Sequence, residues 1–127
     1  MDRQWVTAYI RERFGGEPEY PWSDSPDAFV VRHASNRKWY VLVMSVERRR
    51  LGLPGDGAVD AMNVKCGPIL GGSYLPMPGI FPAYHMNKIH WLTALLDGTV
   101  PEDVIRELLE LSYDLTNVKR KAPKKEV

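Results

Sequence analysis

The sequence predicts an α+β fold, with a helix near each end of the chain and an antiparallel sheet of about five strands between them. Apolar residues recur at helical spacing over residues 3–14 and again after residue 102. Between these stretches, short apolar runs are separated by turn-forming residues, the pattern of strands. The 127-residue chain is expected to form a single domain over residues 1–118, followed by a basic tail over 119–127.

The first expected helix covers residues 3–14. Its apolar stripe runs through Val6, Ile10 and Phe14. The two glycines that follow are expected to end it, because glycine readily adopts the left-handed conformation found after a helix C-terminus.

Strands are expected next. Residues 28–33 and 38–46 should pair antiparallel, and the second is apolar enough that both of its faces should be covered. A third strand over 59–66 alternates, which places Met62, Val64 and Cys66 on one face. The segment 67–79 is rich in glycine and proline, so we expect only a short helical turn there.

The stretch from Tyr84 to Gly98 is the most informative part of the chain. We expect a β-hairpin with strands over 83–87 and 89–96, joined by a two-residue loop of Asn87 and Lys88. Asparagine tolerates the positive φ that such loops need. This register opposes two pairs of side chains, one on each face: His85 with His90, and Tyr84 with Trp91.

A capping-box pattern, Thr99-Val-Pro-Glu102, predicts the start of the last helix. Its apolar stripe is formed by Val104, Leu108, Leu111 and Leu115. The helix is expected to end before the basic tail.

Composition excludes several classes of protein. The chain has no apolar run long enough to cross a bilayer and no signal-peptide pattern at its start, so we expect a cytoplasmic protein that does not contact a membrane. Its one cysteine rules out an internal disulfide. No glycine-rich phosphate loop, catalytic carboxylate pair or serine triad is present, so we expect no enzyme activity and no cofactor.

A zinc site is one interpretation of Cys66, His85 and His90, because zinc accepts cysteine and histidine ligands. Their spacing matches no standard ligand pattern, so structural histidines are favoured and no metal is expected. A buried structural role is likewise favoured for Cys66 over nucleophilic catalysis, since Lys65 points to the opposite face of its strand.

A set of motif residues spreads from Asn63 to Asp114 and carries a family resemblance. Its members are Asn63, Lys65, Cys66, Tyr84, His85, Met86, Asn87, Lys88, His90, Trp91, Asp97, Gly98, Pro101, Ser112, Tyr113 and Asp114. With this set the chain resembles the MmcQ/YjbR family of small bacterial DNA-binding proteins. The resemblance implies a strongly bent antiparallel sheet with an inserted helix, similar to frataxin-like and secretion-chaperone-like folds.

The resemblance also implies a "double wing" arrangement, in which β-hairpins contact DNA. Carried onto this chain, the wings are the hairpin tips near residues 36–38 and 87–88. One departure is the uncharged segment 67–72, where the family commonly has a charged helix, and this places the inserted helix in question.

The leading hypothesis is therefore weak binding to double-stranded DNA through basic hairpin wings. The expected phosphate contacts are Arg37, Lys38, Arg48, Arg49, Arg50, Lys65 and Lys88. The net charge of +1 is low for a dedicated DNA binder, and lysines at exposed turns are often merely solvated. The alternative is a protein-interaction module, a monomer or weak homodimer, that uses an exposed sheet face.

Overall fold

The computed structural model describes residues 1–117 and confirms the α+β class. Its helices are α1 (Arg3–Phe14), α2 (Pro68–Tyr74) and α3 (Glu102–Thr116), with a short 3-10 helix η1 (Arg48–Leu51). Its strands are β1 (Phe29–Arg32), β2 (Trp39–Glu47), β3 (Ala58–Lys65), β4 (Ile80–Pro82) and β5 (Trp91–Leu95). The expected basic tail over 119–127 lies outside the described residues.

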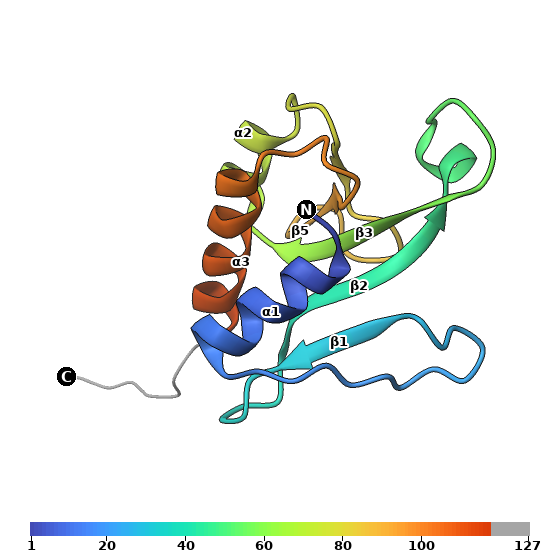
Figure 1. Cartoon of the computed structure of the whole chain (residues 1–127). Helices are drawn as coiled ribbons and strands as arrows, with labels where there is room; N and C mark the ends of the chain where they lie inside the picture. The colour runs from blue at the N-terminus through green and yellow to red at the C-terminus, as the bar shows by residue number, and fades with distance from the viewer. Residues whose placement is uncertain (118–127) are drawn as a thin grey trace.

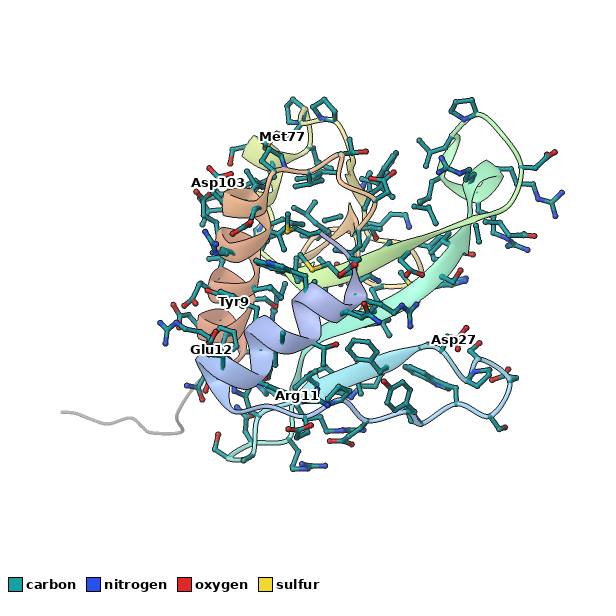
Figure 2. The ribbon with its side chains drawn as sticks, viewed as in Figure 1. Tyr9, Arg11, Glu12, Asp27, Met77 and Asp103 are labelled. Carbon is teal, nitrogen blue, oxygen red and sulfur yellow. The ribbon has the colours of Figure 1, made fainter. Side chains whose placement is uncertain are left out.

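The five strands form one antiparallel sheet in the order β1-β2-β3-β5-β4. Helices α1 and α3 lie on one face of this sheet (Figure 1). Figure 2 labels Tyr9 where these two helices approach each other, and its hydroxyl donates a hydrogen bond to Glu110 of α3 at 2.6 Å. The two terminal helices therefore pack on the sheet and on each other.

Buried side chains form two clusters, one on each face of the sheet. The helix-side cluster lies under α1 and α3 and includes Val6, Val41, Met62, Leu92 and Leu108. The loop-side cluster includes Val30, Leu42, Met44, Ala61 and Leu95, and partly buried aromatic side chains from the loops pack against it. Both faces of β2 are thus covered, as its apolar sequence predicted.

Helix α1 begins and ends as its sequence predicts. The Asp2 carboxylate accepts a hydrogen bond from the backbone N–H of Trp5 at 2.8 Å, which caps the N-terminus. Gly15 follows the last turn with φ of 72°, and its N–H donates to the carbonyl of Arg11. The glycine provides the left-handed residue that this C-terminal cap requires.

A β-bulge shapes the beginning of β2. Val31 is opposite Val41, but Arg32 is opposite Trp39, so Tyr40 is an extra residue without a partner on β1. The bulge places Tyr40 in the helix-side cluster together with Val41, while Trp39 packs on the loop side. Tyr40 is consequently directed toward the ends of α1 and α3.

The two outer strands of the sheet have different neighbours. The outer side of β1 is bridged by Glu19, whose backbone N–H and carbonyl both pair with Val30, at 2.9 and 3.0 Å. Strand β4, at the other side, is only three residues long and ends at Pro82.

The expected two-residue hairpin at Asn87 is wrong. Strand β4 ends at Pro82, which lies opposite Leu92 of β5. Residues 83–90 therefore form a connection longer than two residues. His85 takes a left-handed φ of 62°, which breaks the expected strand. The Asn87 side chain accepts hydrogen bonds from the N–H groups of Ile89 and His90, so a turn does form there, but without flanking strands.

The expected capping box at Thr99 is also wrong. Helix α3 begins at Glu102, and its N-terminal flanking residue is Pro101, which makes no side-chain cap. The Thr99 N–H instead donates to the Asp97 carboxylate at 3.0 Å, closing a turn before the helix. The segment 67–79 does contain the expected short helix, α2. Among residues 1–117, no helix is long and apolar enough to cross a membrane.

Candidate nucleic-acid interface

The basic residues expected to contact phosphate do not form one patch. Arg37 and Lys38 lie in the loop between β1 and β2, whereas Arg48, Arg49 and Arg50 form η1 at the other end of β2. Nine residues of strand separate the two groups, about 30 Å at the usual rise per residue. Figure 1 shows η1 and the β1–β2 loop at opposite ends of the sheet.

Lys65 and Lys88 belong to neither group. Lys65 ends β3 and is half-buried, and its backbone N–H donates to the Ser112 hydroxyl at 2.8 Å. The Lys88 ammonium donates to the carbonyl of Ala83 at 2.8 Å, which closes the connection between β4 and β5. Lys88 is therefore engaged within its own loop instead of standing free at a hairpin tip.

The β2–β3 hairpin projects beyond its neighbours. Strand β1 pairs with β2 only as far as Val43, and the paired positions of β5 on β3 stop at Ala61. The ladder between β2 and β3 continues for further pairs, ending with Glu47 opposite Ala58. Helix η1 follows at the end of this two-stranded ribbon.

We call Arg48, Arg49 and Arg50 the arginine tip. Arg49 and Arg50 both contact the same carboxylate oxygen, Oε1 of Glu47, at 3.4 and 2.9 Å. Their side chains remain 79% and 55% exposed. The hydrogen bond from Arg50, with the charge of Arg49, lowers the pKa of Glu47, so this carboxylate stays ionised.

The arginine tip also lies near the segment that joins β4 to β5. The pKa of Arg50 is raised, first by its hydrogen bond to Glu47 and then by the proximity of Tyr84. The tip loop thus curves toward the loop side of the sheet, where Leu51 and Leu53 pack against the loop-side cluster. This packing holds in place the loop that carries the exposed arginines.

Arg37, in the other basic loop, is paired with an acidic residue. Its guanidinium lies 3.5 Å from Glu19, which also binds Arg32 at 3.1 Å. Arg37 has a left-handed φ of 64°, an uncommon conformation for a residue with a side chain. In both basic regions two arginines thus share one glutamate, and the arginine tip differs in standing on a projecting ribbon.

The motif residues build the connection between β4 and β5. The Asn63 amide donates to the carbonyl of Tyr84 at 2.8 Å and accepts from the Thr93 hydroxyl at 2.6 Å. The His90 carbonyl accepts hydrogen bonds from the N–H groups of Cys66 and Gly67. Met86 packs on the loop-side cluster, and the N–H of Trp91 donates to the carbonyl of Asn87. Each of these contacts is structural.

Of the residues considered as metal ligands, Cys66 and His90 are neighbours, and the Cys66 thiol donates to the His90 carbonyl oxygen at 3.6 Å. No three His, Cys, Asp or Glu side chains in the described part of the chain are arranged to hold a metal ion. Cys66 is buried against Gly71, and burial raises the pKa of its thiol. This agrees with the structural role expected for Cys66.

Sequence reasoning missed a cavity where the C-terminal ends of α1 and α3 meet the β1–β2 loop. Its volume is about 430 Å³, and its lining includes His33, Tyr40 and Tyr113. The two consecutive glycines at positions 15 and 16 were interpreted only as a helix stop, although they also form part of the cavity wall.

Comparisons with known proteins agree with the fold. The model of the YjbR family matches residues 13–115. The uncharacterised protein YyaQ of Bacillus subtilis is 40% identical over 116 residues, which cover 91% of this chain and 98% of YyaQ. The uncharacterised protein YjbR of Escherichia coli is 47% identical over 32 residues, 25% of this chain and 27% of that protein.

Solved structures share the same architecture. A crystal structure of a Pseudomonas syringae protein matches with a TM-score of 0.89 and 43% identity, covering 92% of this chain and all of that one. The crystal structure of Deinococcus radiodurans protein DR2400, with a domain named DUF419, matches with a TM-score of 0.71 and 27% identity. That match covers 95% of this chain and 82% of DR2400.

Proposed function

The chain belongs to the YjbR family, and on that premise we propose that it binds double-stranded DNA through the arginine tip of the β2–β3 hairpin. The proposal is for a binding protein without catalysis. It places the protein in the cytoplasm, where the single free thiol of Cys66 stays reduced. In this proposal a single hairpin contacts DNA. Its contact residues are 48–50, in place of residues 87–88 that the resemblance implied.

One observation carries the proposal: consecutive arginines stand at the end of a ribbon that projects from the sheet. A two-stranded β-ribbon fits the major groove of B-DNA, and guanidinium groups pair well with phosphate oxygens. Glu47 pairs with Arg49 and Arg50, but exposed ion pairs of this kind are worth little in water. A phosphate can therefore replace the Glu47 carboxylate as their partner.

The test is fluorescence anisotropy of a labelled DNA duplex across a range of salt concentrations. The variant carries Arg49→Gln and Arg50→Gln together. The matched control carries Arg11→Gln and Arg13→Gln, which remove two exposed arginines that are also paired with carboxylates. We expect the tip variant to bind more weakly, with a slope of log K against log salt reduced by about two, because two phosphate contacts are lost.

The control variant should retain the slope of the unmodified protein. Equal weakening in both variants would mean that net charge, and not the arginine tip, governs binding. Absence of salt-sensitive binding to the duplex in the unmodified protein would reject the proposal.

A second candidate function is protein interaction, and it is favoured by an exposed apolar patch. Ile69 and Ile89 are 87% and 64% exposed, and Leu70 and Leu75 of the same region are also exposed. This patch lies on α2 and the β4–β5 connection, which together line a small cavity, and not on the covered faces of the sheet. Light scattering across protein concentrations tests whether a second copy covers the patch. Self-association that disappears in an Ile69→Lys, Ile89→Lys variant would support it.

A further inference from the structure

The cavity between the ends of α1 and α3 lies at the opposite end of β2 from the arginine tip. Its volume of about 430 Å³ falls within the range of small-molecule sites. Figure 1 shows the C-terminal ends of α1 and α3 close to the loop that joins β1 to β2. The cavity is thus independent of the proposed DNA contact.

The inner wall of the cavity is aromatic. The rings of Phe14 and Tyr113 stack with centroids 4.1 Å apart, and Tyr40 meets both rings edge-on. His33 packs against Tyr113, with its ring centroid at 4.5 Å. Phe14 and Tyr113 cover each other's faces, and Arg13 lies over the Phe14 ring at 5.5 Å, so the wall offers ring edges against which the face of a planar molecule can pack.

The Tyr40 hydroxyl is a polar group that the described residues leave unsatisfied. Tyr40 is only 1% exposed, and no residue of 1–117 forms a hydrogen bond with its hydroxyl. Burial raises the pKa of this phenol, so it remains a neutral donor. An unpaired buried hydroxyl is costly, and most buried polar groups have a partner.

His33, which also lines the cavity, is hydrogen-bonded to Thr116 of α3. The Thr116 hydroxyl donates to the carbonyl of Ser112 at 2.7 Å, so it accepts the hydrogen bond from Nε2 of His33, also at 2.7 Å. Burial lowers the pKa of His33, which keeps the ring neutral. The Tyr40 hydroxyl is therefore a fully buried group of this wall with hydrogen-bonding capacity to spare. The Tyr113 hydroxyl also lacks a partner among the described residues, but that side chain is only partly buried.

The backbone of Gly16 lies close to the Tyr40 hydroxyl. A Cβ atom at Gly16 would lie 2.3 Å from this hydroxyl and 2.7 Å from Val31. A residue with a side chain would therefore clash at position 16, and glycine is required there.

The mouth of the cavity is lined by two arginines and two glutamates, Arg32, Arg37, Glu17 and Glu19. Arg32 and Arg37 both contact Glu19, whereas Glu17 is paired with Arg11 outside the lining, so these five side chains together carry one excess positive charge. Arg37 is held in its uncommon left-handed conformation at the mouth. Such backbone conformations concentrate at ligand sites.

We propose that this cavity binds a small molecule with a planar aromatic body and an anionic head group. The head pairs with Arg37 and Arg32 at the mouth, and the ring packs against Tyr113 and Phe14. A hydrogen-bond acceptor on the ring receives the Tyr40 hydroxyl. Carboxylate and phosphate heads share this chemistry, since guanidinium groups bind both.

The test uses 4-hydroxybenzoate and 4-hydroxyphenyl phosphate as probes, with the neutral 4-hydroxybenzamide as the matched control. Binding is followed by backbone amide chemical shifts of the full chain at millimolar probe concentrations. We expect saturable shifts at residues 15–17, 33–38 and 113–117 for at least one anionic probe, and weaker binding of the amide. The preferred probe identifies the head group.

Two substitutions separate the ligand role from a structural one. Tyr40→Phe should weaken binding about tenfold while leaving the melting temperature equal or higher, because it removes a hydroxyl without a partner. Tyr74→Phe is the matched control, since the Tyr74 hydroxyl donates to Glu107 outside the cavity. Arg37→Asn should abolish the preference for anions over the amide, and asparagine tolerates the left-handed conformation.

Certain results would overturn the proposal. These are no saturable shifts with either anion, equal binding of the amide, shifts centred outside the cavity, or unchanged affinity in Tyr40→Phe. The Arg49→Gln, Arg50→Gln variant should bind the probe as the unmodified protein does. Loss of DNA binding in that variant therefore leaves the cavity intact as a separate site.

Discussion

At the scale of single residues, Asn63 organises the loop side of the sheet. It is fully buried, and its amide joins β3 to the backbone of Tyr84 and to the Thr93 hydroxyl on β5. The same Thr93 hydroxyl accepts the N–H of Tyr84 at 2.8 Å. These hydrogen bonds hold the β4–β5 connection against the sheet.

We predict that Asn63→Ala lowers the free energy of unfolding by about 2 kcal/mol, because it leaves buried polar groups without partners. Thr93→Val should have a similar effect. The double variant should lose less unfolding free energy than the two single variants lose together, since both changes break the same hydrogen-bond network. Urea unfolding measures all three, with exposed Ser45→Ala as a control expected to stay within about 0.5 kcal/mol. Strict additivity would contradict the network.

The sequence identified Asn63 and Tyr84 as motif residues, but not what they do. The partners of Asn63 are 21 and 30 residues away along the chain, so no local pattern reveals them. The arginine tip was recognisable as a run of like charges, whereas its projection beyond the sheet depends on where β1 and β5 stop pairing. The cavity was not predictable, because it is formed by segments from both ends of the described chain.

At the scale of elements, the sequence predicted correctly the helices and strands whose ends are determined by neighbouring residues. Asp2 and Gly15 bound α1, and its limits were expected correctly. The prediction of a hairpin at Asn87 failed because the sequence alternates through residues 84–86, whereas the backbone of Tyr84 accepts a hydrogen bond from Asn63 and donates one to Thr93. These side-chain contacts replace the ladder hydrogen bonds expected for Tyr84. Tertiary contacts decided the conformation of this segment.

Helix α2 contains adjacent glycines in different surroundings. A Cβ atom at Gly71 would lie 2.8 Å from Sγ of Cys66, whereas a Cβ atom at Gly72 meets nothing within 4 Å. Gly71 is therefore needed for the close approach of α2 to the end of β3. Gly72 only adds flexibility to the helix.

We predict opposite effects for alanine at these neighbouring positions. Gly72→Ala should raise the free energy of unfolding by about 0.5–1 kcal/mol, because alanine favours the helix. Gly71→Ala should lower it by about 1–3 kcal/mol, because the added methyl group overpacks the Cys66 site. Urea unfolding of both variants checks this, and each serves as the control for the other. Equal changes at the two positions would contradict the described packing.

At the scale of the whole molecule, one sheet separates the two apolar clusters. Strands β2 and β3 contribute side chains to both of them. Neither cluster can lose its packing without affecting the strands that support the other. The chain should therefore unfold as a single cooperative unit.

Tryptophan fluorescence tests this, because Trp5 packs on the helix-side cluster and Trp39 on the loop-side cluster. Two variants each retain one of these and replace the other three tryptophans by phenylalanine. Within each variant, the urea midpoint from tryptophan fluorescence should coincide with that from far-UV circular dichroism. A fluorescence transition that precedes the loss of secondary structure would show that one cluster opens independently.

The bordering strands of the sheet have a consequence for the protein at high concentration. The backbone of Glu19 already occupies hydrogen-bonding groups of β1 at Val30, and Pro82 offers no N–H on the short β4. A foreign strand has little template to extend at β1 or β4, so growth of the sheet into fibrils from these two borders is disfavoured. Prolonged storage should leave dye-binding amyloid absent.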